Sequence, residues 1–168
     1  MASTHRLYLL RHARAEPAQP GQSDFDRSLG LEGRADAAAL GRLLVARGIA
    51  FHHVVSSGAV RTRETWHCLA EAGLETPLTI DDSLYHHGEA AYIAAAMRFA
   101  PQDVVLLGHN PTIGEFARRL ASDGEAQAVE RLSRGFPTCA LAVFRLDART
   151  ASPKAFLEEL LIPPFPVR

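Results

Sequence analysis

Two short, uninterrupted runs of apolar residues constrain the fold of this chain most strongly. Leu7–Leu10 lies near the N-terminus, and Val104–Leu107 lies in the second half of the sequence. A short continuous apolar run is typical of a strand buried in a core. The two runs therefore predict buried strands over Arg6–Leu10 and Asp103–Leu107.

Helical patterns alternate with these strands. Leucines at helical spacing predict a helix over Glu32–Arg47, and similar patterns predict helices over Thr62–Ala72 and Glu89–Phe99. Asn110 and Pro111 are typical of an N-cap and a first helical position, so a fourth helix is expected to run from there through Leu120. Further strands are expected at His53–Ser56, Leu78–Ile80, Ala140–Leu146 and Ala155–Leu161, the last of which could also be a short helix. This alternation predicts a three-layer α/β/α sandwich with a mostly parallel central sheet, in a single domain over residues 1–168.

The composition limits the partners of such a domain. Its 168 residues carry a formal net charge of −1, which gives no overall field to attract nucleic acid or an anionic membrane. Cys68 and Cys139 lie far apart without metal-ligand spacing, so a reducing compartment is favoured over a disulfide framework. Neither a leader segment nor a membrane-spanning stretch is apparent. These features predict a cytoplasmic protein and leave its oligomeric state open.

Chemically rich segments follow three of the predicted strands. Arg11-His12 follows the first strand, Ser56-Ser57-Gly58 ends the second, and Gly108-His109-Asn110 follows Asp103–Leu107. Arg61 comes shortly after the second of these segments. Ligands of α/β sheets bind at the carboxyl ends of the strands. The residues expected to meet at that edge are Arg11, His12, Arg61 and His109.

This set of side chains suits phosphoryl transfer. A neutral imidazole can attack phosphorus when its other nitrogen is held by an acceptor, which makes His12 a candidate nucleophile. A guanidinium binds two phosphate oxygens at once, and helix N-terminal amides near Arg61 also attract anions. His109 could stabilise charge in the transition state. Each group alone fits a structural role at least as well as a functional one, and their convergence favours the functional interpretation.

The motifs together resemble the histidine phosphatase superfamily, also called the phosphoglycerate-mutase-like fold. They are a strand followed by Arg-His, then S-x-x-x-R-x-x-x-T, then G-H-N-P. The short chain, and Asp24–Leu29 followed by Gly33, resemble the SixA-like branch of phosphohistidine phosphatases. The resemblance implies that His12 is transiently phosphorylated. It implies that the substrate is held by Arg11, Arg61, His109 and Asn110, with no metal or other cofactor. The substrate would be a phosphohistidine protein or a small phosphate ester.

The chain departs from the family pattern at three places. The usual glycine after Arg-His is here Ala13, which the SixA-like branch tolerates. Mutase-like members carry Asn six positions beyond the nucleophile, where this chain has Ala18, and this disfavours a mutase. The usual general acid has no clear counterpart, and His86 or Glu89 occupies its region. Because an alcohol leaving group needs protonation, a site without a strong acid favours P–N substrates.

Two other functions remain open from the sequence. The first is a phosphomonoesterase acting on a small sugar or nucleotide phosphate, and the second is a non-catalytic phosphate-binding module. The pairs His52-His53 and His86-His87 are weak indications of a metal site, because adjacent residues rarely ligate one ion together. No nucleotide-binding motif is present.

Overall fold

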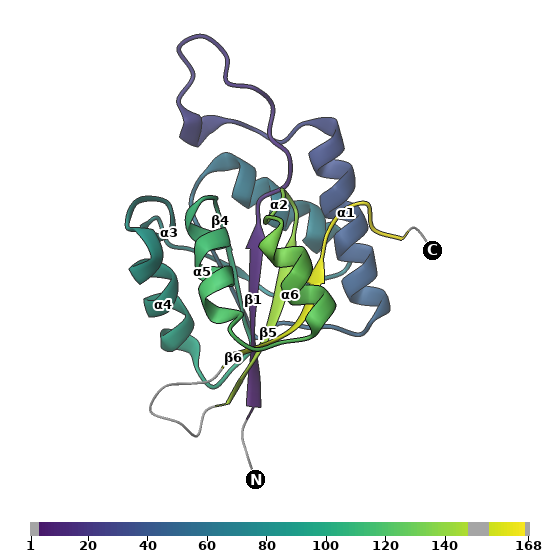
Figure 1. The fold of residues 1–168 in the computed structure, drawn as a ribbon. Helices are drawn as coiled ribbons and strands as arrows, with labels where there is room; N and C mark the ends of the chain where they lie inside the picture. Colours follow the sequence, from purple (N-terminus) through teal and green to yellow (C-terminus); the bar gives the residue numbers. More distant parts are fainter. Residues whose placement is uncertain (1–3, 148–154, 167–168) are drawn as a thin grey trace.

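The computed structural model describes residues 4–147 and 155–166, and within these ranges the chain forms one six-stranded sheet in the order β3-β2-β4-β1-β5-β6 (Figure 1). The first four of these strands pair in parallel, whereas β5 pairs antiparallel with β1 and with β6. A mostly parallel sheet is thus confirmed, and the last segment is a strand rather than a helix. The strands are β1 (Thr4–Arg11), β2 (His53–Ser56), β3 (Leu78–Ile80), β4 (Val104–Gly108), β5 (Leu141–Asp147) and β6 (Ala155–Leu161).

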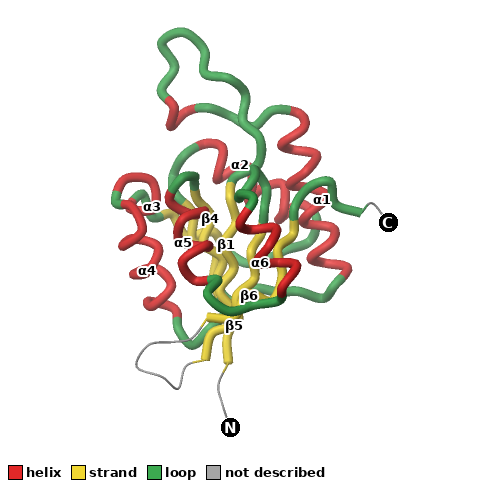
Figure 2. Tube along the Cα trace, viewed as in Figure 1, coloured by secondary structure: helices red, strands yellow, loops and turns green. Residues whose placement is uncertain are grey.

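Helices cover both faces of the sheet, which confirms the three-layer sandwich (Figures 1 and 2). One face packs against α1 (Leu31–Ala46) and α2 (Val60–Glu71). The other packs against α3 (Ser83–His86), α4 (Gly88–Phe99), α5 (Thr112–Leu120) and α6 (Ala126–Ser133). A 3₁₀ turn, Asp24–Asp26, lies in the long loop before α1. No helix in the described part of the chain is long and apolar enough to cross a bilayer.

The apolar run of β1 contributes to both layers of the core. Leu7 and Leu9 belong to the cluster under α4, α5 and α6, while Tyr8 and Leu10 belong to the cluster under α1 and α2. Successive side chains of a strand point to opposite faces, so a strand covered on both sides needs apolar residues without interruption. Full burial of each such side chain stabilises the fold by roughly 1.5–3 kcal/mol.

Two features differ from the sequence-based predictions. The proposed cap of α5 was wrong: the helix begins at Thr112 after Pro111, and the Asn110 side chain donates to the Phe136 carbonyl at 2.9 Å instead of capping the helix. The short helices α3 and α6 were not predicted. In α6 only two residues, Ala128 and Leu132, are buried, and so short an apolar stripe gives a weak periodic signal.

The strand order brings the predicted segments together. The carboxyl ends of β2, β4 and β1 lie side by side, with Ser56 opposite Leu107 and Arg11 opposite Gly108. This edge is the upper one in Figure 1, below the long loop that precedes α1. The loops that follow these three strands therefore share one end of the sheet, as expected.

Candidate active site

The backbone after β1 is fastened to its neighbours on both sides. The His12 N–H donates to the Gly108 carbonyl at 3.1 Å, and the His12 carbonyl accepts from the Cys139 N–H at 3.0 Å. As a result, His12 and His109 face each other with ring centroids 5.2 Å apart. The two imidazoles that the sequence singled out thus occupy one site.

His12 is held in one tautomer. Its Nδ1 lies 2.7 Å from the Ala13 carbonyl, which can only accept, so Nδ1 carries the proton. The Arg61 Nε–H points to Nε2 at 3.3 Å, which requires a lone pair on that nitrogen. Burial, helped by the charges of Arg61 and Arg11, lowers the pKa of His12 to about 4 and outweighs the opposing effect of the bond to Ala13. At neutral pH His12 is an uncharged imidazole with Nε2 available as a nucleophile.

Arg61 is buried in the first turn of α2 with only 5% of its surface exposed. Besides the bond to His12, its Nη1 donates to the backbone carbonyl of Asp24 and its Nη2 to the carboxylate of Asp24 at 2.8 Å. Three of its five N–H groups are therefore engaged, and two remain for a substrate. The Thr65 hydroxyl, one turn later, accepts the Ala13 N–H at 3.0 Å and so ties α2 to the loop after His12.

Asp24 and Tyr85 border the site, and neither was predicted to have a role there. The Asp24 carboxylate accepts from Arg27 at 2.8 Å, from the Tyr85 hydroxyl at 2.7 Å and from Arg61. These bonds, led by that of Arg27, hold the pKa of Asp24 well below its usual range, so it is ionised and cannot serve as an acid. The Tyr85 ring packs edge-on against His109 with centroids 5.1 Å apart. Asp24 could have been suspected from its place in the motif; nothing in the sequence marked Tyr85.

A chain of hydroxyl groups sets the tautomer of His109. Thr62 Oγ1 lies 2.9 and 2.8 Å from the carbonyls of Ser57 and Ala59, and since carbonyls only accept, its proton is used there. Ser57 Oγ, 3.0 Å from Thr62 Oγ1, must then donate to it. Ser57 Oγ consequently accepts from His109 Nε2, 2.6 Å away. His109 therefore carries its proton on Nε2 and a lone pair on Nδ1.

The other ring nitrogen of His109 is free. Within the described ranges Nδ1 is buried without a hydrogen-bond partner. Burial, followed by the charges of His12 and Arg61, lowers the pKa of His109 to about 3. His109 is thus neutral in the free protein, with one unsatisfied nitrogen that an incoming group can use.

Two glycines are required by close contacts around the site. A Cβ at Gly108 would lie 1.8 Å from the Tyr92 hydroxyl, which accepts the His109 N–H at 3.2 Å. A Cβ at Gly33, the last residue of the motif that begins at Asp24, would lie 2.1 Å from the Arg14 carbonyl. Gly33 therefore lets α1 pack directly on the loop that follows His12.

Arg11, the residue before His12, is held by the loop that precedes β5. Its Nη1 donates to the Phe136 carbonyl at 2.9 Å, the same carbonyl that accepts from Asn110. Its Nε is buried and, within the part of the chain described, has no partner. Arg11 is fixed in place by Phe136, with donors still free for an anion, and Asn110 lies beside it.

Neither candidate acid contacts the four central residues. His86 is exposed, and its ring touches Tyr85 with centroids 4.9 Å apart. Glu89, half-buried at the start of α4, forms an ion pair with Arg119 of α5. Their role as an acid stays a prediction. In the described ranges, no three His, Cys, Asp or Glu residues are grouped so as to hold a metal ion.

The chain is also similar in sequence to a known protein family. The histidine phosphatase superfamily (branch 1) matches this chain over residues 7–90, which include Arg11, His12 and Arg61. The chain belongs to this superfamily. The match also spans Asp24 and Tyr85, the two site residues that sequence reasoning had given no role.

Relatives within the superfamily extend the similarity to nearly the whole chain. An uncharacterized protein of Mycobacterium tuberculosis is 35% identical over 147 residues, which are 84% of this chain and 90% of the relative. SixA of Agrobacterium tumefaciens, a candidate phosphohistidine phosphatase, has a structure with a TM-score of 0.81 and 33% identity, covering 94% of this chain and 98% of its own. The structure of a second candidate SixA, from Nakamurella multipartitia, has a TM-score of 0.81 and 30% identity, and the match covers 96% of this chain and 97% of that one.

Proposed function

We propose that this protein is a phosphohistidine phosphatase of the SixA type that works through a covalent phosphohistidine on His12. The observation that carries the proposal is the state of His12. It is buried and neutral, its Nδ1–H is fixed on the Ala13 carbonyl, and its Nε2 lone pair lies beside Arg61. A nucleophilic imidazole needs this tautomer and a cation next to the attacking nitrogen.

The phosphoryl group binds between the two arginines and His109. Arg11 and Arg61 each retain N–H donors that fit phosphate oxygens. The negative charge of the phosphoryl group raises the pKa of His109, because an anion nearby favours the imidazolium. His109 then takes up a proton on Nδ1 and donates it in a hydrogen bond to a phosphoryl oxygen, which satisfies its unpartnered nitrogen.

The reaction proceeds in two displacements at phosphorus. In the first, His12 Nε2 forms a bond to phosphorus while the P–N bond of the substrate breaks, and the released imidazole nitrogen takes a proton from solvent. In the second, water attacks phosphorus, the bond to His12 Nε2 breaks, and one proton passes to solvent as hydrogen phosphate is released. His12 returns to the neutral tautomer because its Nδ1–H stays on Ala13 throughout.

The proposal of a P–N substrate rests on the lack of an evident general acid in the site. General acid catalysis is worth roughly 10²–10⁴ in rate for a poor leaving group such as an alcohol. Asp24 is ionised, and Glu89 is paired with Arg119. The imidazole of a phosphohistidine departs more readily than an alkoxide, so it depends less on a strong acid. The similarity to SixA structures over nearly the whole chain supports the same choice.

The test compares substrates on one enzyme preparation. Phosphate release is measured from a phosphohistidine protein, a phosphoserine protein, an aryl phosphate, and a panel of sugar and nucleotide phosphates, with His12→Ala as the control. We expect the highest kcat/KM on the phosphohistidine protein and no turnover by His12→Ala. A higher value on a small phosphate ester would make the protein a phosphomonoesterase. Phosphate binding without any turnover would make it a binding module.

The same assay tests independence from metal ions. Two guanidiniums and His109 supply the positive charge that a metal would otherwise bring to the phosphoryl group. We expect a chelator to leave the rate unchanged, and vanadate or tungstate to inhibit by occupying the phosphoryl position. Loss of activity with chelator, restored by one divalent ion, would contradict this part of the mechanism.

A further inference from the structure

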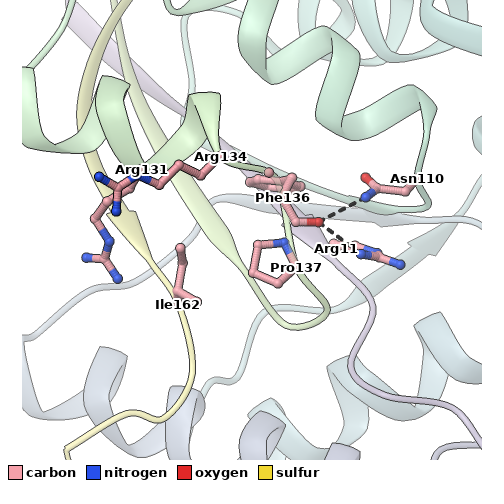
Figure 3. Close-up of a pocket in the computed structure, with 8 residues that line it drawn as sticks. Arg11, Asn110, Arg131, Arg134, Phe136, Pro137 and Ile162 are labelled. Atoms are coloured by element: carbon pink, nitrogen blue, oxygen red, sulfur yellow. Dashed lines mark hydrogen bonds between the residues drawn. The ribbon is translucent and has the colours of Figure 1, made fainter.

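A pocket of about 460 Å³ opens beside the candidate active site (Figure 3). We call it the arginine pocket. It is lined mainly by Arg11, Asn110, Arg131, Arg134, Pro137 and Ile162. Figure 3 shows Arg131 and Arg134 on one side of Phe136 and Pro137, with Arg11 and Asn110 on the other. The pocket therefore reaches from the phosphoryl site to the C-terminal end of α6.

The arginine pocket carries excess positive charge. Three of the residues that line the pocket are arginines, and no Asp or Glu is among the lining residues. In the part of the chain that the structure describes, the Arg131 side chain has no hydrogen-bond or ion-pair partner. Arg134 pairs with Glu130 one turn earlier in α6, but both side chains are exposed, and exposed pairs of this kind contribute little to stability. An incoming carboxylate can compete with it.

The pocket is continuous with the catalytic residues. Arg11 lines it and is also the residue directly before His12. Asn110 follows His109, and both Arg11 and Asn110 donate to the Phe136 carbonyl at 2.9 Å. That shared bond fixes the boundary between the phosphoryl site and the pocket. A substrate whose phosphoryl group lies on His12 thus has its neighbouring atoms within reach of the pocket.

The arginines on the two sides of the site differ in how far they are paired. Near Asp24, both Arg61 and Arg27 are already bound to its carboxylate, whereas Arg131 in the arginine pocket has no such partner among the described residues. A substrate with negative groups near its phosphoryl group is therefore attracted more strongly towards the arginine pocket. The charge distribution therefore favours one orientation of an acidic substrate.

We propose that the arginine pocket binds an acidic segment of a phosphorylated protein, close in space to the phosphohistidine that His12 attacks. Guanidinium groups bind carboxylates through paired hydrogen bonds. Arg131 and Arg134 are exposed, so their contacts are suited to orienting and attracting a protein surface rather than enclosing a small molecule. Pro137 and Ile162 add an apolar wall for the aliphatic parts of the segment.

The proposal rests on the proposed phosphohistidine phosphatase activity and is tested with matched substrates. One phosphohistidine peptide is flanked by glutamates and the other by glutamines, and an aryl phosphate serves as a substrate without flanking groups. The variants are the double substitution Arg131→Ala with Arg134→Ala, and Arg42→Ala as a control. Arg42 is an exposed arginine of α1, on the other face of the sheet.

We expect the double variant to lose roughly tenfold in kcat/KM on the glutamate peptide, mainly through a higher KM, because two exposed ion pairs with the peptide are lost. The glutamine peptide and the aryl phosphate should be cleaved as by the unaltered protein, and Arg42→Ala should change nothing. The preference for the glutamate peptide should also weaken at high salt.

Equal kcat/KM for the two peptides in the unaltered protein would overturn the proposal, as would equal losses on the aryl phosphate. A loss confined to small esters with a second phosphate would contradict a protein segment as the occupant. If no substrate were cleaved, the proposed function would fail instead. The affinity of the labelled peptides, measured by fluorescence anisotropy, would then test the arginine pocket independently of catalysis. Equal affinity of the unaltered protein and the double variant for the glutamate peptide would overturn the proposal.

Discussion

His12 and His109 occupy equivalent structural positions, yet their ring nitrogens are held in opposite ways. Each follows a buried parallel strand, each is 9% exposed, and burial lowers the pKa of each below its usual value. They differ in which nitrogen is fixed. His12 is held through Nδ1 by a backbone carbonyl, whereas His109 is held through Nε2 by the hydroxyl of Ser57.

The difference shows that the hydrogen-bond partner of one ring nitrogen determines which nitrogen of a histidine keeps its lone pair. Holding Nδ1 leaves His12 with its Nε2 lone pair beside the Arg61 guanidinium. Holding Nε2 leaves His109 with a buried Nδ1 that gains a partner only when an anion and a proton arrive. We therefore assign the covalent step to His12 and the charge-stabilising hydrogen bond to His109.

Among the substitutions that test the difference between His12 and His109, we expect the largest loss of activity at Arg61, the arginine beside His12. Arg61→Ala removes a buried donor to His12 and to the phosphoryl group, so we expect a loss of about 10³-fold in kcat/KM. Arg63→Ala is the matched control. Arg63 is exposed, lies about 200° around the helix axis from Arg61, and donates to the Gly58 carbonyl. Steady-state kinetics on one phosphohistidine protein measures both. Equal losses would show that His12 does not depend on Arg61 in the way described.

A smaller effect is expected on the His109 side. Ser57→Ala removes the acceptor that fixes Nε2–H, while Ser56→Ala removes a neighbouring buried hydroxyl that donates to the Ser57 carbonyl. We expect Ser57→Ala to lower kcat roughly tenfold, about the value of one hydrogen bond to a group that becomes charged, and to shift the pH profile of kcat. Ser56→Ala should leave the profile in place. An unshifted profile in Ser57→Ala would mean that Ser57 only packs against His109.

The smallest effect concerns stability rather than rate. The pKa of His12 falls from an unfolded value of about 6.5 to about 4, so between these values the unfolded state binds more protons and the free energy of unfolding decreases as pH falls. His12→Gln should remove on the order of 1–2 kcal/mol of the difference in unfolding free energy between pH 7 and pH 5. Denaturant unfolding at the two pH values measures it, with His67→Gln, at an exposed histidine of α2, as the control. A pH dependence equal to that of the unaltered protein would argue against a buried, neutral His12.

The scaffold of the site could be predicted from the sequence because it depends on local patterns. Apolar runs such as Leu7–Leu10 indicate buried strands, and a parallel sheet places their carboxyl ends at one edge. That rule predicts that Arg11, His12, Arg61 and His109 lie at one end of the sheet. The structure places His12 and His109 5.2 Å apart and Arg61 in bonding contact with His12.

What could not be predicted depends on contacts between distant loops. Asp24 reaches Arg61 only because the loop before α1 folds back over the site, and Tyr85 meets His109 through the short helix α3. The arginine pocket depends on α6, whose two buried residues are too few to give a clear period. The tautomers of the two histidines follow from single hydrogen bonds, which no spacing of residues reveals.

The most direct test of the different roles is to locate the covalent phosphate. The protein is mixed rapidly with a substrate whose phosphoryl group is radiolabelled, the reaction is quenched, and the labelled residue is identified by peptide mapping. We expect base-stable, acid-labile label on His12, as an N–P bond requires, with none in His12→Ala and slow accumulation in His109→Ala. Label on His109, or full turnover by His12→Ala, would contradict the assignment of the two histidines.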